Sequence, residues 1–350
     1  MSHKLPECWG HRGASARFPE NTMASFEAAI RDGVDGLESD VHVSKDHVVL
    51  MFHDPTLDRT TNQTGAIKER DWYGEGGMEH ARTKKSPQQA IPTFAETLEL
   101  LMKPENQHVT FNVDIKPNND PAVLFPLLHK LIVAHESWET LLAPRLVLGL
   151  WHPRFIPFAR EILPGCRRSY LGISVSDART YFWDNVDTIS LLFASIISNG
   201  GRTFVEQMHA AGKRVMVWTV NDPEMMLEAI SWEPDVIMTD KTYLLIDLKK
   251  QLAADYDKVM SSRKQLPIWR SSLAYWPLIG LGSYLIRRLR LEKLAGPFDG
   301  SLETPVPPEI IPGKSEKPIE EVLPEHDALA DNPLANETIP SNAVLSAASG

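Results

Sequence analysis

Residues 8 to 54 read CWGHRGASARFPENTMASFEAAIRDGVDGLESDVHVSKDHVVLMFHD, and the fold and chemistry of the chain are decided in this stretch. It holds two histidines in polar contexts, His11 within HRG and His53 within HD. Between them, Glu38 and Asp40 stand two residues apart in an apolar run that reads as a strand. Side chains two positions apart on a strand lie on the same face of the sheet. Glu38 and Asp40 are therefore expected side by side.

The polar face of this strand needs compensation, because buried carboxylates without a cation are very costly. A metal ion, a basic partner or water could supply it. Paired carboxylate oxygens suit a hard divalent cation such as Mg²⁺ or Ca²⁺ better than zinc. Two nearby histidines could move protons near neutral pH.

Four motifs occur in order within about sixty residues: HRGA (11 to 14), PENT (19 to 22), GLESDVHVSKDHVVLMFHD (36 to 54) and DPTLDRTTNQTG (54 to 65). Together they resemble the glycerophosphodiester phosphodiesterase family. Weaker similarity continues through IPTFAETLELL (91 to 101), NVDIKP (112 to 117), VMVWTVND (215 to 222) and VIMTDK (236 to 241). The resemblance covers roughly residues 5 to 250.

Strand-like and helical patterns alternate over the first 250 residues, which is typical of repeated βα units around a parallel sheet. We expect strands at 6–11, 36–43 with a short continuation at 47–52, 108–115, 145–151, 167–174, 189–193, 213–220 and 235–239. This predicts an α/β fold of the (β/α)₈ barrel type, as in phospholipase C-like phosphodiesterases. A doubly wound open sheet would also alternate, but no Gly-rich dinucleotide loop follows the first strand.

Composition limits the function classes. The chain has 350 residues, 43% hydrophobic and 23% charged, with a net charge of −10. Residues 297–350 hold ten acidic residues against two lysines, so most of the negative charge lies in this tail. No broad basic surface is indicated, which argues against nucleic-acid binding. Cys8 and Cys166 are far apart in sequence and favour a reducing compartment without a disulfide. The amino terminus has no apolar signal segment.

We expect three regions along the chain: a barrel over 1–262 with an insertion at 54–92 over the active-site rim, a membrane-associating segment over 263–296, and a disordered acidic tail over 297–350. Residues 273–286 are fourteen uncharged residues flanked by arginines. That is fewer than the ~18 to 20 residues that span a bilayer as a helix. We expect a monotopic anchor, through 267–291, on a membrane or lipid-droplet surface. A buried helix packed on the barrel is the alternative.

A third carboxylate joins the first two. In FNVDIKP, Asn112, Asp114 and Lys116 share one face of a strand. Active sites of barrel enzymes lie at the carboxyl ends of the strands. We therefore predict Glu38, Asp40 and Asp114 as ligands of one divalent cation, Mg²⁺ or Ca²⁺. Family members usually carry Glu at the third place, so this chain's Asp is one methylene shorter.

Proton transfer is assigned to His11 and His53, both by the resemblance and because phosphodiester cleavage needs one proton removed and one given. Arg12 and Lys116 are candidate phosphate clamps, or compensate the carboxylates. Trp218 resembles the family's aromatic wall against glycerol, although a core tryptophan would look the same.

The resemblance implies a metal-dependent phosphodiesterase whose substrate carries a glycerol, with a cyclic phosphate intermediate. A barrel followed by a hydrophobic segment resembles the fungal phosphatidylglycerol phospholipase C branch, which would release diacylglycerol from a glycerophospholipid. The location would then be intracellular, facing the cytosol on a lipid droplet, the endoplasmic reticulum or mitochondria. One alternative is a phosphodiesterase for soluble glycerophosphodiesters. Another is an inactive lipid-surface binding module.

Overall fold

A computed structural model describes residues 4–197, 201–261, 285 and 287–298. The predicted membrane-associating segment lies mostly outside these residues, and of the predicted acidic tail only 297 and 298 are described. No helix within the described ranges is both long and apolar enough to cross a bilayer.

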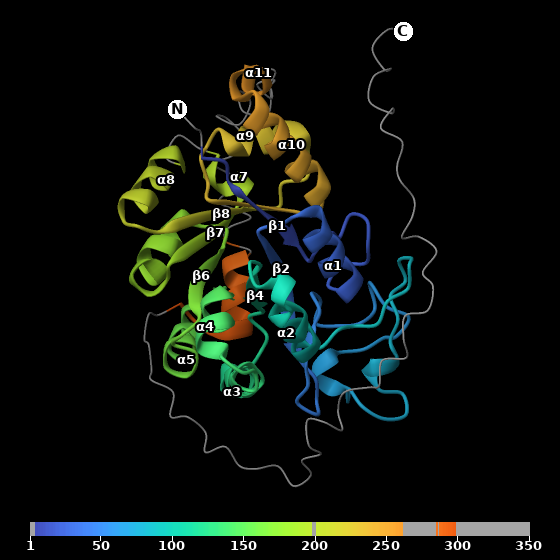
Figure 1. The fold of residues 1–350 in the computed structure, drawn as a ribbon. Coiled ribbons are helices and arrows are strands. Elements are labelled where there is room, and N and C mark those ends of the chain that lie inside the picture. Colours follow the sequence, from blue (N-terminus) through green and yellow to red (C-terminus); the bar gives the residue numbers. More distant parts are fainter. Residues whose placement is uncertain (1–3, 198–200, 262–284, 286, 299–350) are drawn as a thin grey trace. The chain divides into compact units, whose positions relative to one another are not determined.

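Eight parallel strands close into a barrel, which confirms the predicted fold (Figure 1). They pair in the order β1, β9, β8, β7, β6, β5, β4, β2, and β2 returns to β1. The short β3 (Val49–Met51) pairs antiparallel with β2. The barrel strands are β1 (Glu7–His11), β2 (Gly36–Val43), β4 (Thr110–Ile115), β5 (Leu146–Leu150), β6 (Arg167–Gly172), β7 (Thr188–Leu192), β8 (Arg214–Trp218) and β9 (Val236–Thr239).

Helices surround the strands (Figure 1). They are α1 (Met23–Asp32), α2 (Phe94–Met102), α3 (Pro121–Val133), α4 (Trp138–Leu141), α5 (Ile156–Ile162), α6 (Val175–Asp177), α7 (Phe193–Ile196), α8 (Gly201–Ala210), α9 (Pro223–Ile230), α10 (Thr242–Ala254) and α11 (Tyr256–Ser261). The Thr22 side chain caps the amino terminus of α1 by accepting from the Ser25 backbone amide.

The main core fills the space between strands and helices. Outward-facing strand residues such as Leu37, Phe111 and Ile115 are fully buried in it, together with Phe26 and Phe94 from the helices. Burial of this apolar surface is the main stabilising contribution. Cys8 and Cys166 are buried and free, which confirms the prediction that they form no disulfide.

The segment between β3 and α2 has a small core of its own, built from Leu50, Phe52, Leu57, Ile67, Trp72, Met78, Ala81 and Ile91. This cluster holds a long connection in place without regular strands, apart from single bridges such as that between Thr61 and Thr83. The connection brings Asp54 and Arg59 toward the carboxyl ends of the barrel strands, where Arg59 pairs with Asp54 and with Glu20 of the PENT motif.

Candidate active site

The three predicted carboxylates come together at the carboxyl ends of neighbouring strands. Asp40 on β2 is in register with Asp114 on β4, and Glu38 is in register with His11 on β1. Their ligand atoms all lie within 4.8 Å of one another, and each of the three residues is at least 97% buried. This cluster is the only group of three or more metal-ligating side chains found among the described residues.

The electrostatics of the cluster fit a divalent cation. Burial and the neighbouring Asp40 raise the pKa of Glu38 to about 8. Burial also raises the pKa of Asp114 to about 6, although Lys116 opposes this. Three buried carboxylates repel one another when all are ionised. A divalent cation such as Mg²⁺ or Ca²⁺ would compensate their negative charge. The residues present therefore suit a hard metal ion, and their chemistry does not choose between the two.

Lys116 lies among the carboxylates. Its Nζ is 2.6 Å from Asp40 Oδ1 and 2.7 Å from Asp114 Oδ2. Burial would raise the pKa of Asp40, but Lys116 and Arg12 outweigh it and hold that pKa well below its usual value. Of the two roles considered for Lys116, charge compensation is therefore the one that its contacts display, and phosphate contact stays a prediction.

His11 is oriented by Asp240, which follows β9. Its Nδ1 is 2.7 Å from Asp240 Oδ1, and its Nε2 is 3.9 Å from Glu38 Oε2. Because an ionised carboxylate only accepts, the proton of this bond belongs to Nδ1, which leaves Nε2 facing the carboxylates. Burial lowers the pKa of His11, but Asp240 and Glu38 raise it above the usual value. Asp240 also accepts from Ser15 Oγ and from the Asn221 amide.

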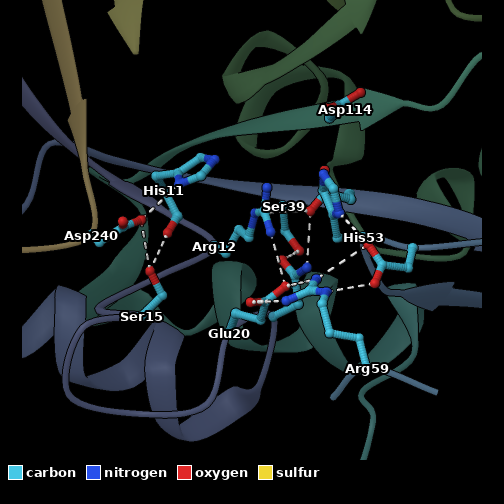
Figure 2. Close-up of polar contacts among 12 residues, drawn as sticks. His11, Arg12, Ser15, Glu20, Ser39, His53, Arg59, Asp114 and Asp240 are labelled. Atoms are coloured by element: carbon cyan, nitrogen blue, oxygen red, sulfur yellow. Dashed lines mark hydrogen bonds and ion pairs between the residues drawn. The ribbon is translucent and has the colours of Figure 1, made fainter. Parts of the chain in front are cut away.

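His53 is held by a second polar network (Figure 2). Its Nδ1 donates to Asp54 Oδ1 at 2.7 Å, and Arg59 Nε donates to Asp54 Oδ2 at 2.6 Å. Arg59 also donates to Glu20 of the PENT motif. Burial lowers the pKa of His53, and the Asp40 charge opposes this. In Figure 2, His11 and His53 lie on either side of Arg12, and their role as an acid/base pair stays a prediction.

Arg12 depends on the glycine that follows it. Arg12 has φ 58° and Gly13 φ 80°, and a Cβ on Gly13 would meet the Ser25 side chain at 2.0 Å. The turn directs the Arg12 amide to Glu38 Oε2 at 3.0 Å. The Arg12 guanidinium pairs with Glu20 at 2.9 Å and lies 3.6 Å from Asp40. The atom nearest Asp40 is the buried Nε, which forms this ion pair without a hydrogen bond among the described residues, and phosphate contact by Arg12 stays a prediction.

Trp218 ends β8 and contacts a second tryptophan. Trp151, which follows β5, lies edge-on to it with ring centroids 5.9 Å apart. The Trp151 indole also donates to Asp114 Oδ1 at 2.7 Å. Trp218 is half-buried, and its Nε1 has no hydrogen-bond partner among the described residues. The two rings form one wall beside the carboxylate cluster, and glycerol contact by Trp218 stays a prediction.

Four residues of this site were not assigned roles from the sequence: Asp240, Asn21, Arg59 and Trp151. Asn21 donates to Asp40 Oδ2 at 2.9 Å, and the other three hold His11, Asp54 and Asp114 as described. Asn21 and Asp240 stand inside the PENT and VIMTDK motifs, which were the available signal. Their targets lie 19 and 229 residues away, a distance that no local spacing rule bridges.

Comparison with known proteins agrees with this geometry. The model of the glycerophosphoryl diester phosphodiesterase family matches residues 11–244. This chain belongs to that family. It is thus a phosphoric diester hydrolase, as the predicted resemblance implied. The narrower resemblance to the fungal phosphatidylglycerol phospholipase C branch is not confirmed.

Relatives in the family come from bacteria and animals. A glycerophosphodiester phosphodiesterase of Bacillus altitudinis is 24% identical over 252 residues, covering 71% of this chain and all of the relative. Glycerophosphodiester phosphodiesterase domain-containing protein 4 of Macaca fascicularis is 30% identical over 274 residues, which are 69% of this chain but 41% of that protein.

Solved structures share the fold. The glycerophosphodiester phosphodiesterase of Agrobacterium tumefaciens has a TM-score of 0.55 at 23% identity, covering 69% of this chain and all of that one. An Oleispira antarctica phosphodiesterase in complex with the product sn-glycerol-3-phosphate has a TM-score of 0.58 at 23% identity, covering 72% and 97%.

Asp240→Asn is expected to lower kcat by about 10²- to 10⁴-fold with little change in KM, because the amide no longer fixes the proton on His11 Nδ1. Steady-state kinetics on a glycerophosphodiester measure this split. Ser15→Ala, which removes another donor to the same Asp240 oxygen, is the matched control and is expected to change kcat far less. Equal losses in the two variants would contradict an orienting role for Asp240.

Proposed function

We propose that this enzyme hydrolyses soluble glycerophosphodiesters to glycerol 3-phosphate and an alcohol. The observation that carries the proposal is a pair of oriented histidines around a buried cluster of Glu38, Asp40 and Asp114 at the carboxyl ends of the barrel strands. Relatives that match over nearly their whole length are named glycerophosphodiester phosphodiesterases. The structure of the Oleispira antarctica phosphodiesterase contains the product sn-glycerol-3-phosphate.

The three carboxylates would hold one divalent cation, which supplies positive charge to a bound phosphodiester when present. Residues of the chain itself would bind the phosphate and transfer the protons. The Arg12 guanidinium, which pairs with Glu20 and faces Asp40, would contact a phosphate oxygen. One histidine takes the proton of a glycerol hydroxyl as its oxygen attacks phosphorus, and the other protonates the departing alcohol. Water then opens the cyclic phosphate, with the two proton transfers reversed.

The neighbouring hydroxyl explains why glycerol would be required while the leaving alcohol can vary. A hydroxyl held beside phosphorus reacts as an internal nucleophile, which removes the entropic cost of bringing a second molecule to the site. The wall formed by Trp151 and Trp218 would limit the freedom of the glycerol. The enzyme would then require glycerol on one side of the phosphate and accept different alcohols on the other.

Phosphatidylglycerol carries the same glycerol headgroup, so phospholipase C activity is the second candidate. The segment expected to anchor the chain, 267–291, is described only at 285 and 287–291, so membrane association through it stays a prediction. The clustering of both histidines with their carboxylate partners argues against a purely structural lipid-binding module, because such a module has no need of oriented imidazoles.

Product analysis separates these functions. The full chain with Mg²⁺ or Ca²⁺ is expected to release glycerol 3-phosphate from glycerophosphoglycerol, measured with a coupled glycerol 3-phosphate assay, and to stop when a chelator is added. The same preparation is tested on phosphatidylglycerol vesicles for diacylglycerol. Release of diacylglycerol without turnover of any soluble glycerophosphodiester would overturn the proposal in favour of the phospholipase. Turnover of neither would contradict both.

A further inference from the structure

A large cavity opens beside the candidate active site. Its volume is about 870 Å³, and His53, Lys116 and Trp151 line its inner end. Cavities of this size bury ligands much larger than choline or ethanolamine. His11, Glu38 and Trp218 are not among its lining residues, so it extends from the His53 side of the phosphate position. Trp151 borders both the cavity and the wall assigned to glycerol, so with glycerol against Trp218 the rest of the cavity lies where the leaving alcohol would be.

The outer wall of this cavity comes from residues beyond the family match. Residues 287–295 form a helix, orange-red in Figure 1, that lies near β6. Arg287, Arg290, Leu291 and Leu294 of this helix line the cavity. The family model ends at residue 244, so this wall is a feature of the present chain that the family resemblance does not supply.

The helix is fixed to the barrel by specific contacts. Arg288 pairs with Asp177 at 2.8 Å and lies over the Phe298 ring, 3.6 Å from its centroid. His152, which follows β5, packs on the same ring with centroids 4.2 Å apart and donates through Nε2 to the Gly296 carbonyl at 2.9 Å. Phe298 is 94% buried as a result. Of the helix residues that line the cavity, Arg288 takes part in these contacts, whereas Arg287 and Arg290 do not.

The charge of the cavity is positive. Its lining contains six lysines and arginines against three aspartates. Lys116 is paired with Asp40 and Asp114, and Asp54 and Asp177 are paired with arginines. By contrast Lys68, Arg287 and Arg290 make no hydrogen bond or ion pair with the part of the chain that the structure describes. A cationic group entering the cavity would meet these uncompensated charges.

Apolar side chains make up much of the remaining lining. Ile67 comes from the connection after β3, Ile173 follows β6, and Leu291 and Leu294 come from the added helix. Leu294 is 44% exposed, so it offers apolar surface to a ligand in the cavity. Apolar surface beside unpaired cations suits a ligand that is apolar in body and carries either no charge or negative charge.

We propose that this cavity is the leaving-group subsite and that it selects uncharged or anionic alcohols with an apolar body over the cationic alcohols choline and ethanolamine. Arg287 and Arg290 set the charge preference, and Leu291 and Leu294 contact the apolar part. The inference rests on the proposed function, because it concerns the alcohol that the hydrolysis releases.

Two synthetic substrates isolate the charge. Glycerophosphocholine and the glycerophosphodiester of 3,3-dimethylbutanol have nearly the same shape, since a quaternary carbon replaces the quaternary nitrogen. The measured quantity is the ratio of kcat/KM for the dimethylbutyl ester to kcat/KM for the choline ester. The two alcohols differ in acidity, but this difference is the same for every variant, so the change in the ratio reports the subsite alone.

Arg290→Glu and Arg287→Glu are each expected to lower this ratio by about 3- to 10-fold relative to wild type at low salt, mainly by improving turnover of the choline ester. Lys293→Glu is the matched control, because Lys293 is exposed on the same helix but does not line the cavity. It is expected to leave the ratio unchanged. The effect of Arg290→Glu is also expected to shrink at high salt.

A second pair of variants tests the apolar contact. Leu294→Gln is expected to lower kcat/KM for the dimethylbutyl ester by about 3- to 10-fold. It is expected to leave kcat/KM unchanged for the methyl glycerophosphodiester, whose leaving alcohol is too small to reach Leu294. Leu289→Gln, on the same helix, 65% exposed and outside the cavity lining, is expected to change neither. If the dimethylbutyl and choline esters are both hydrolysed and no cavity variant alters the ratio of their kcat/KM values, the inference is overturned and the proposed function stays intact. Failure to hydrolyse any glycerophosphodiester would overturn the proposed function and the inference with it.

Discussion

Replacing His11 with alanine is expected to lower kcat on a glycerophosphodiester by about 10²- to 10⁴-fold, the range contributed by a positioned proton-transfer group. The imidazole is oriented by Asp240 at 2.7 Å and its Nε2 points toward the carboxylate cluster. Loss of the ring removes one of the two proton transfers and leaves the cation site with all three ligands. Steady-state kinetics with saturating Mg²⁺ or Ca²⁺ measure the effect.

The folding of the His11→Ala chain needs a check of its own, which circular dichroism and thermal unfolding supply. His80→Ala is the matched control, because this histidine is largely exposed and its only described partner is the adjacent Glu79. It is expected to keep full activity. Wild-type turnover in a correctly folded His11→Ala enzyme would contradict the acid/base assignment.

The second large effect concerns the carboxylates. Glu38→Gln is expected to abolish measurable hydrolysis and also to stabilise the metal-free chain, because it removes one of three buried, mutually repelling acidic groups. Thermal unfolding without metal would then show a higher Tm than wild type. Wild type is expected to gain stability when the cation is added, by about 2.7 kcal/mol at a concentration 100 times the Kd.

The distinguishing result for Glu38→Gln is a higher Tm without metal together with a loss of activity. Glu38→Gln should lose most of the cation-dependent rise in Tm, whereas Asp247→Asn, a substitution on α10 far along the chain from the cluster, should retain it. If the cation stabilised Glu38→Gln as strongly as wild type, the ion would bind elsewhere and the proposed ligand set would be wrong.

The periodicity of the chain predicted most of the barrel. The strand expected at 36–43 is β2 with the same limits, and the short strand expected after it is β3, one to two residues shorter at each end. Same-face spacing on β2 and β4 also placed Glu38, Asp40 and Asp114 together. These features follow from local alternation, which a sequence displays directly.

Contacts between distant segments could not be predicted in this way. Asp240 reaches His11 only because β9 pairs with β1, and Trp151 reaches Asp114 only because β5 pairs with β4. The sequence left two roles open for Lys116, phosphate clamp and charge compensation, and the structure adds that its side chain bridges Asp40 and Asp114. The helix at 287–295 was expected near a membrane, and the contacts that set its position involve His152 and Asp177, which no motif marks.

The pairing of β1 with β9 has a further consequence for synthesis of the chain. His11 emerges from the ribosome early, whereas the carboxylate that orients it is made 229 residues later. A growing polypeptide therefore carries both histidines and all three carboxylates long before it can orient His11. Turnover should switch on only when the barrel closes, so the onset of hydrolysis would report that the last strand has joined the first.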